Sequence, residues 1–223
     1  MTMDVNELMM AQENMKEPSL FDHIGNKIMT HDREIKIIAK IEEPRIVILG
    51  NVLSNEECDE LIAISKDRMK RSKIGSKREE DTLRTSSSLF LEEGETDVVT
   101  RVERRVAQVM NIPYEHGEGL QILNYQIGQE YKAHFDFFAS SSKPVSNPRI
   151  STMVMYLNDV EEGGETYFPK LNFSVSPHKG MAVYFEYFYD NQELNDLTLH
   201  GGGPVINGDK WAATQWMRRK SVK

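Results

Sequence analysis

The second half of the chain, from residue 120 to residue 217, is a series of short apolar segments separated by turn residues. This pattern restricts the fold more than any other feature of the sequence. Asn207-Gly208 is typical of the intervening turns. The expected strands cover residues 120–127, 131–135, 149–158, 166–168, 172–175, 181–188, 198–200 and 211–217. About eight short strands over roughly 100 residues, with no helix between them, predict a double-sheet jelly roll, or double-stranded β-helix.

Two amphipathic helices are expected before these strands. Ser54 and Glu57 have the spacing of a capping box, and apolar residues follow at helical spacing. Valines at helical spacing predict a second helix from Thr96 to Met110. We expect both helices to cover the outer face of one sheet, which gives an α+β fold.

The 223 residues suffice for one large domain with a sizeable core, which we expect to occupy residues 35–223. Residues 1–34 are polar and rich in methionine, so they are expected to form a partly helical or flexible arm. The highly charged stretch 66–84 is predicted to be a mobile loop, either a substrate lid or a solvated loop without a role.

Net charge, cysteine content and apolar runs restrict the binding partners, the metal sites and the cellular location that the sequence allows. The net charge of −8 argues against nucleic acid and anionic membranes, since both are polyanions. Cys58 is the only cysteine, so neither an intrachain disulfide nor a cysteine-based zinc site is expected. The sequence shows no apolar run of about 18 residues and no signal-peptide pattern, which predicts a cytoplasmic location.

Three residues in the strand region have the chemistry of a metal site. On an extended strand, His134 and Asp136 would point to the same face. Such a pair alone is most often a surface pair or a satisfied strand histidine. His200, before a glycine-rich turn, offers a second imidazole. Two histidines and one carboxylate suit non-haem Fe(II), with positions left for oxygen and a co-substrate.

Lys210 follows His200 by ten residues. A short turn would return it alongside the strand that carries His200. Most lysines are solvated surface amines, but Lys210 precedes Trp211 in an otherwise apolar strand. We therefore expect its ammonium group to bind the far carboxylate of a 2-oxo acid held by iron.

Together these motifs resemble the catalytic domain of prolyl 4-hydroxylases, which are Fe(II)- and 2-oxoglutarate-dependent dioxygenases. The resemblance covers roughly residues 44 to 220. The residues that carry it are Pro44-Arg45, Leu53-Ser54-Asn55-Glu56-Glu57-Cys58, Tyr125, His134-Phe135-Asp136, Arg149, Gly163-Gly164-Glu165-Thr166, Gly180-Met181-Ala182, His200-Gly201 and Gly208-Asp209-Lys210-Trp211. The iron motif and Lys210 alone indicate only the dioxygenase superfamily. Tyr125, the Gly163-Gly164-Glu165-Thr166 run and Lys210-Trp211 narrow the resemblance to the prolyl hydroxylase branch.

The resemblance implies a role for each residue. His134, Asp136 and His200 would hold Fe(II), and with Lys210 they would form the catalytic set. The residues implied to bind 2-oxoglutarate are Lys210, Thr166 and Tyr125, and those implied to lie near the target ring are Tyr131, Arg149 and Trp211. The implied activity is that of a procollagen-proline 4-dioxygenase-like oxidoreductase, which uses O2 and 2-oxoglutarate, with ascorbate as reductant, and releases succinate and CO2.

Two alternatives remain open from the sequence. One is an oxygenase of the same chemistry that acts on a lysyl side chain or a free amino acid. The other is a non-catalytic jelly-roll binding module, which the intact metal and lysine motifs argue against. A proline within a peptide is the expected substrate, because free proline is a zwitterion whose pocket would need partners for two charges. A homodimer is compatible with the sequence.

Overall fold

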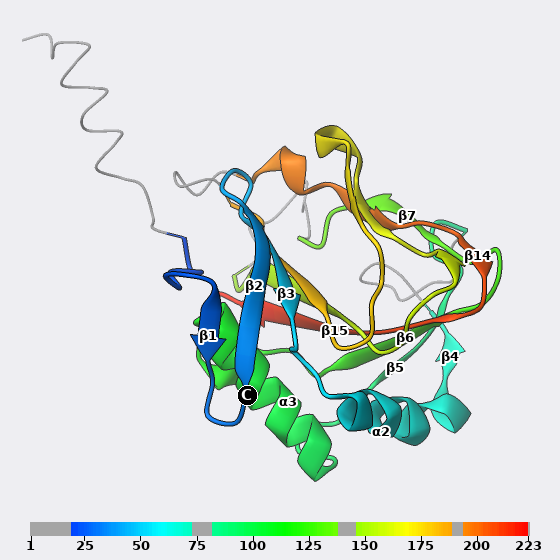
Figure 1. The fold of residues 1–223 in the computed structure, drawn as a ribbon, viewed down its shortest axis with the longest axis horizontal. Helices are drawn as coiled ribbons and strands as arrows, with labels where there is room; N and C mark the ends of the chain where they lie inside the picture. The colour runs from blue at the N-terminus through cyan, green and yellow to red at the C-terminus, as the bar shows by residue number, and fades with distance from the viewer. Residues whose placement is uncertain (1–18, 73–81, 138–145, 189–193, 223) are drawn as a thin grey trace, which may run out of the picture.

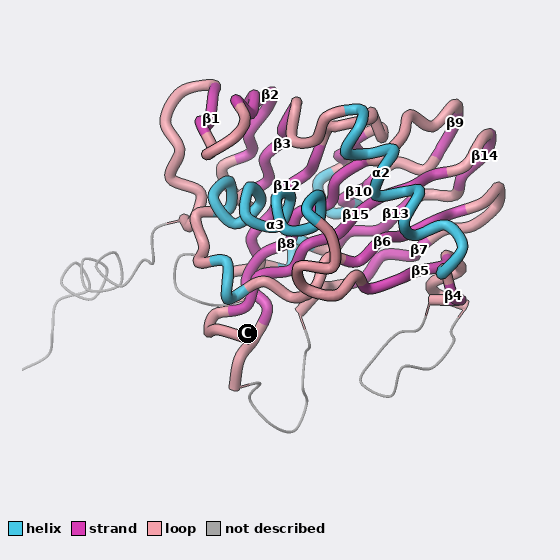
Figure 2. The backbone as a smooth tube through the Cα atoms, turned by 90° about the horizontal axis from the view of Figure 1, so that it is seen from below, coloured by secondary structure: helices cyan, strands magenta, loops and turns pink. Residues whose placement is uncertain are grey.

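The structure is a computed structural model that describes residues 19–72, 82–137, 146–188 and 194–222. Its largest element is a nine-stranded sheet (Figures 1 and 2). In spatial order the strands are β1 (Lys27–Met29), β2 (Glu34–Ile41), β3 (Ile46–Gly50), β12 (Ala182–Glu186), β8 (Arg149–Tyr156), β15 (Lys210–Arg218), β6 (Gln121–Tyr125), β5 (Ser87–Phe90) and β4 (Lys70–Arg71).

Two smaller sheets complete the strand region. A four-stranded sheet has the order β11 (Phe173–Val175), β10 (Thr166–Phe168), β13 (His200–Gly202) and β7 (Tyr131–His134). A two-stranded sheet pairs β14 (Val205–Asn207) with β9 (Glu162–Gly163). Short 3-10 helices span Lys66–Arg68, Tyr114–His116, Pro169–Leu171 and Asp196–Thr198.

The nine-stranded and four-stranded sheets share a buried core. Side chains alternate between the two faces of a strand. On the nine-stranded sheet, Val183 and Phe185 therefore point inward, where they pack with Phe168 and Val175 of the four-stranded sheet. The polar residues of the expected site lie in the space between the inner faces of these two sheets.

The outer face of the nine-stranded sheet packs against two helices, α2 (Asn55–Ser65) and α3 (Asp97–Met110). Leu61 of α2 and Val102 of α3 are fully buried in one cluster with Met153 and Met155 of β8. Figures 1 and 2 show both helices on the same side of this sheet. No described helix has the length and apolar character needed to cross a membrane.

Both helix starts have side-chain caps. The Ser54 hydroxyl accepts a hydrogen bond from the Glu57 amide, and the Glu57 carboxylate accepts one from the Ser54 amide, which makes a capping box. Thr96 caps α3, and Asn111 ends that helix in the left-handed conformation with φ 53°. These residues set the helix ends close to where the sequence pattern begins and stops.

Each of the eight strands expected between residues 120 and 217 overlaps an observed strand. The largest shift concerns residues 198–200, where the strand begins only at His200. Asn195 caps a 3-10 helix over Asp196–Thr198, so these residues turn before β13 starts. The short strands β1, β4, β9 and β14 were not expected from the sequence.

Residues 19–34 of the expected N-terminal arm pack against the domain. Phe21 and Ile28 are buried in its core, and β1 pairs with β2. The Glu186 carboxylate accepts a hydrogen bond of 3.0 Å from the Phe21 amide. Residues 1–18 lie outside the described residues, so an arm there stays a prediction.

Candidate active site

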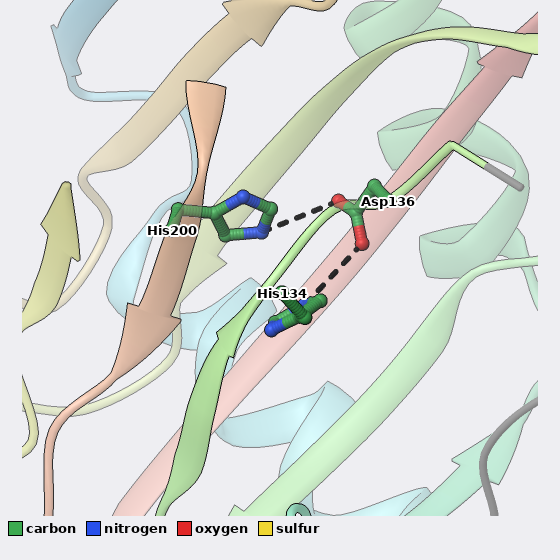
Figure 3. Close-up of side chains that lie close together, drawn as sticks. All are labelled: His134, Asp136 and His200. Atoms are coloured by element: carbon green, nitrogen blue, oxygen red, sulfur yellow. Dashed lines mark ion pairs between the residues drawn. The ribbon is translucent and has the colours of Figure 1, made fainter. Parts of the chain in front are cut away.

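Strand pairing brings the two histidines of the iron motif together. His134 ends β7, His200 begins β13, and the two are directly opposite in the antiparallel register. Asp136 lies just beyond the end of β7. Its two carboxylate oxygens are each 3.5 Å from the Nε2 atom of one histidine (Figure 3). One ligand atom from each residue lies within 4.8 Å of the others, which fits a shared divalent metal ion.

Each histidine has a backbone carbonyl next to Nδ1, and this contact fixes which ring nitrogen is left free to bind a metal. Nδ1 of His134 lies 2.9 Å from the Lys132 carbonyl, and Nδ1 of His200 lies 3.0 Å from the Thr198 carbonyl. A carbonyl oxygen only accepts, so Nδ1 carries the proton and Nε2 presents a lone pair to the site. Burial lowers the pKa of His200 to about 4, which keeps this imidazole neutral at pH 7.

Asp136 is held from behind by hydroxyl groups of the nine-stranded sheet. Thr152 of β8 donates a hydrogen bond of 2.7 Å to Oδ2 of Asp136, and its hydroxyl also bonds that of Tyr187. Burial would raise the pKa of Asp136, but its electrostatic interactions with His200, His134 and Arg149 and a hydrogen bond with His134 outweigh burial and lower this pKa. The carboxylate is therefore ionised and oriented, as a metal ligand requires.

Lys210 presents a buried cation to the same site from the opposite sheet. It begins β15, faces Tyr125 of β6 in register, and is only 4% exposed. Its Nζ donates a hydrogen bond of 2.6 Å to the Gly164 carbonyl and lies 5.4 Å from the Tyr125 ring centroid. Burial lowers the pKa of Lys210 to about 8. Within the described part of the chain no carboxylate forms an ion pair with it, so this ammonium can receive the carboxylate of a ligand.

The path from His200 to Lys210 differs from the expected one. A short turn would have placed Lys210 alongside the strand that carries His200. Instead, residues 205–207 form β14, which pairs with β9, and the chain then crosses to the nine-stranded sheet. Lys210 therefore reaches the site from across the interior rather than from beside β13.

Thr166 and Tyr125 complete this end of the site. Thr166 lies on β10, opposite Gly202 of β13. Its hydroxyl accepts a hydrogen bond of 2.8 Å from the Tyr156 hydroxyl, which leaves its own hydrogen for another acceptor. Seven of the nine residues expected from the sequence line one pocket between the two sheets, namely Tyr125, Tyr131, His134, Asp136, Thr166, His200 and Lys210.

Gly201 keeps the pocket wall close to the second histidine. A Cβ atom at this position would lie 2.6 Å from the Tyr167 ring and 2.8 Å from the Tyr131 carbonyl oxygen. No side chain fits there without moving the backbone of β7. The glycine after His200 is thus a packing requirement of the β13–β7 pair.

Trp211 lies away from the pocket, which corrects its expected position near the target ring. Neighbouring residues on a strand point to opposite faces, and Lys210 points inward. Trp211 therefore packs on the outer side against the helix-facing core, and its Nε1 donates a hydrogen bond of 2.7 Å to Asp209. Trp216 shares the inward face of β15 and lines the pocket. The alternation counted from Lys210 would have identified it.

Arg149 lies beside the pocket rather than in its lining. Its Nε and Nη2 atoms donate hydrogen bonds of 2.6 and 2.7 Å to the Glu118 carboxylate. Its guanidinium carbon is 3.9 Å from the Trp216 ring centroid, and Nη1 is 3.4 Å from the Asp136 carbonyl oxygen. Arg149 therefore supports Trp216 and the iron motif, and direct contact with substrate stays a prediction.

Arg84 is a pocket residue that the sequence did not single out, because it ends a long charged stretch. It is buried, lies over the Tyr131 ring at 4.8 Å, and donates a hydrogen bond of 3.1 Å to Gln121. Tyr131 in turn stacks on His134 with ring centroids 3.5 Å apart. Residues 73–81 of the charged stretch lie outside the described residues, so a lid there stays a prediction.

Comparison with known proteins agrees with this geometry. Residues 120–218 match the family model of the 2OG-Fe(II) oxygenase superfamily. "Probable prolyl 4-hydroxylase 3" of Arabidopsis thaliana is 39% identical over 199 residues, which cover 78% of this chain and 69% of that protein. "Prolyl 4-hydroxylase 5" of the same plant is 37% identical over 233 residues, which cover 93% of this chain and 77% of that protein.

A solved structure is also similar. The viral collagen prolyl hydroxylase of Paramecium Bursaria Chlorella virus-1, solved as its 2-oxoglutarate complex, superposes with a TM-score of 0.65 at 30% identity. The match covers 78% of this chain and 95% of that one. The sheet-rich structure described above is the jelly-roll core of such oxygenases, and the His–Asp–His cluster fits their Fe(II). This chain belongs to the prolyl 4-hydroxylase family of Fe(II)- and 2-oxoglutarate-dependent dioxygenases.

Proposed function

We propose that this protein hydroxylates peptidyl proline at C4, consuming O2 and 2-oxoglutarate and releasing succinate and CO2. The observation that carries the proposal is the convergence of a His–Asp–His cluster and a buried lysine in one pocket. The family named above supports the choice of proline as the substrate.

The three clustered side chains would hold Fe(II) through Nε2 of His134, the Asp136 carboxylate and Nε2 of His200. With 2-oxoglutarate and O2, the iron supplies the oxidising chemistry, in which one oxygen atom enters a C–H bond and the other enters succinate. The protein fixes the imidazole tautomers and keeps the carboxylate ionised. Thr152 and Tyr187 keep that carboxylate oriented from behind.

The other end of the pocket would bind 2-oxoglutarate. Lys210 would pair with the carboxylate distant from the metal, and the hydroxyls of Thr166 and Tyr125 would donate hydrogen bonds to the same molecule. A buried ammonium without a carboxylate partner binds an anion strongly, because the low-polarity surroundings screen the attraction weakly. This arrangement selects a co-substrate with a second carboxylate.

The remaining polar and aromatic groups favour a peptide over a free amino acid. Tyr131, Arg84 and Trp216 line the pocket and would contact the proline ring and neighbouring peptide groups. Free proline also carries an ammonium group, which needs an acidic partner. Among the described lining residues the only carboxylate is Asp136, which is committed to the metal cluster. A peptide presents a neutral amide there instead.

We propose that helices α2 and α3 stabilise the outer face of a double-stranded β-helix, because their buried residues share one core with β8. A cytoplasmic setting is proposed from the lone Cys58, because reducing conditions suit a chain without disulfides and help keep iron ferrous. Ascorbate is the proposed reductant.

The test is a product analysis with a matched catalytic control. Fe(II)-loaded protein is incubated with 2-oxoglutarate, air and a panel of proline-containing peptides. We expect a mass gain of one oxygen atom, 4-hydroxyproline after hydrolysis, and no product from the His200→Ala variant. Formation of 3-hydroxyproline or hydroxylysine, or efficient turnover of free proline, would contradict the proposal.

A further inference from the structure

Phe90 is a large aromatic side chain that remains 42% exposed beside the pocket. On the nine-stranded sheet it lies opposite Gln121 of β6, which lies opposite Thr214 of β15. Directly opposed residues share one face of a sheet. Thr214 lines the pocket, so Phe90 projects from the same inner face, two strands further toward the sheet edge.

Phe90 is also connected to the metal cluster through Trp216. The ring centroids of Phe90 and Trp216 are 6.2 Å apart, within the range of aromatic pairs. Trp216 lies opposite Thr152, whose hydroxyl binds Asp136. Thr152, Trp216 and Phe90 thus form a path from the metal cluster to solvent that crosses four neighbouring strands, β8, β15, β6 and β5. We call the last two rings the Phe90–Trp216 ledge.

The neighbours of this ledge suit a polypeptide. Arg149 covers the Trp216 ring at 3.9 Å, and Gln121, beside Phe90, accepts a hydrogen bond from Arg84. An apolar surface with amide and guanidinium groups next to it can contact a ring while the flanking peptide groups find polar partners. Because Trp216 lines the pocket and Phe90 packs against Trp216, a peptide with its proline at the metal cluster would pass over the ledge.

We propose that the Phe90–Trp216 ledge binds a second ring residue of the substrate, proline or an aromatic residue, at a fixed distance from the target proline. The inference rests on the proposed function. Strands lie about 4.8 Å apart, so the path from β8 to β5 spans roughly 14 Å. A polyproline II chain rises about 3.1 Å per residue, which places the second ring about four residues from the target. The ledge is therefore a specificity-determining element.

The experiment compares peptides that differ at one flanking position. Each peptide carries one target proline in an alanine background, and a tyrosine is moved through every position up to six residues on either side. The ratio of kcat/KM for the tyrosine peptide to that for the alanine peptide is measured. We expect a ratio of about three to ten at a position near four residues from the target.

Variants then assign this preference to the ledge. Phe90→Ala should lower the ratio to about one at that position, and Phe90→Trp should retain it. Ile38→Ala removes another exposed apolar side chain, 55% exposed, from β2, which is distant in the same sheet, and should keep the wild-type ratio. Because the Phe90 side chain is 42% exposed, its replacement should leave the fold intact, and thermal unfolding checks that each variant is folded.

The outcomes separate this inference from the proposed function. A wild-type ratio near one at every position, or an unchanged ratio in Phe90→Ala, would overturn the ledge while proline hydroxylation stands. If the wild-type protein consumes 2-oxoglutarate but hydroxylates no proline peptide, the proposed function itself fails, and the ledge with it.

Discussion

Replacing Lys210 with methionine should make the protein more stable and nearly unable to use 2-oxoglutarate. Lys210 is 4% exposed, and among the described residues its ammonium group has no carboxylate ion-pair partner. Methionine has a similar length, so it fills the same space without the charge. The two effects therefore have opposite signs, which a surface lysine would not produce.

The magnitude follows from the burial of the charge. A pKa lowered from 10.5 to about 8 means that the charged lysine costs the folded state about 3 kcal/mol at pH 7. The lost hydrogen bond to Gly164 offsets about 1 kcal/mol of the gain. A net gain of about 2 kcal/mol raises Tm by roughly 4–8 °C in a domain of this size.

The pH dependence has a definite sign. The folded-state pKa of Lys210 is lower than its unfolded value, so the full cost is present below pH 8 and disappears as the pH rises to about 10.5. The wild-type protein should therefore approach the stability of Lys210→Met across this window. Loss of the cation for the co-substrate carboxylate costs about 3–5 kcal/mol, which is at least a hundredfold in 2-oxoglutarate affinity.

Two measurements check this reasoning. Thermal unfolding without co-substrate at pH 7 and pH 10 gives the stability difference, and calorimetric titration of 2-oxoglutarate into anaerobic Fe(II)-loaded protein gives the affinity. Fe(II) affinity should be unchanged, because Lys210 is not in the metal cluster. A lower Tm for Lys210→Met at pH 7, or an unaltered 2-oxoglutarate affinity, would refute the argument.

Three other predictions test the site. His200→Ala and Asp136→Ala should each lose Fe(II) binding and all turnover while the circular dichroism spectrum is kept, and near wild-type activity at trace iron would disprove the metal assignment. Thr152→Val should weaken Fe(II) binding by roughly ten- to hundredfold, and Thr152→Ser should restore it, with titration calorimetry as the readout. Trp211→Phe loses the hydrogen bond to Asp209, so it should cost about 1–2 kcal/mol of unfolding free energy and leave the KM for the peptide unchanged. Trp216→Ala changes the pocket lining and should raise the KM for the peptide. The reverse pattern would show that Trp211, not Trp216, contacts the peptide.

Local chemistry determined the elements of this protein. Alternation of apolar residues, turn-forming residues and the Ser54–Glu57 capping box act over a few neighbouring residues, so eight of the strands after residue 120 and the start of α2 could be predicted, whereas the short strands β9 and β14 could not. The same holds for the metal ligands. His134 and Asp136 share a face because they are two residues apart on an extended chain, and His200 was found by its residue type and the turn after it.

Only the tertiary structure decided which of these faces meet. Pairing of β13 with β7 put His200 opposite His134, and crossing to the other sheet brought Lys210 to the pocket from the far side. Once Lys210 faces the pocket, alternation along β15 turns Trp211 outward and Trp216 inward, because a single residue step reverses the face of a strand. Register and sheet order arise from contacts between segments far apart in the chain, and no local pattern in the sequence encodes them.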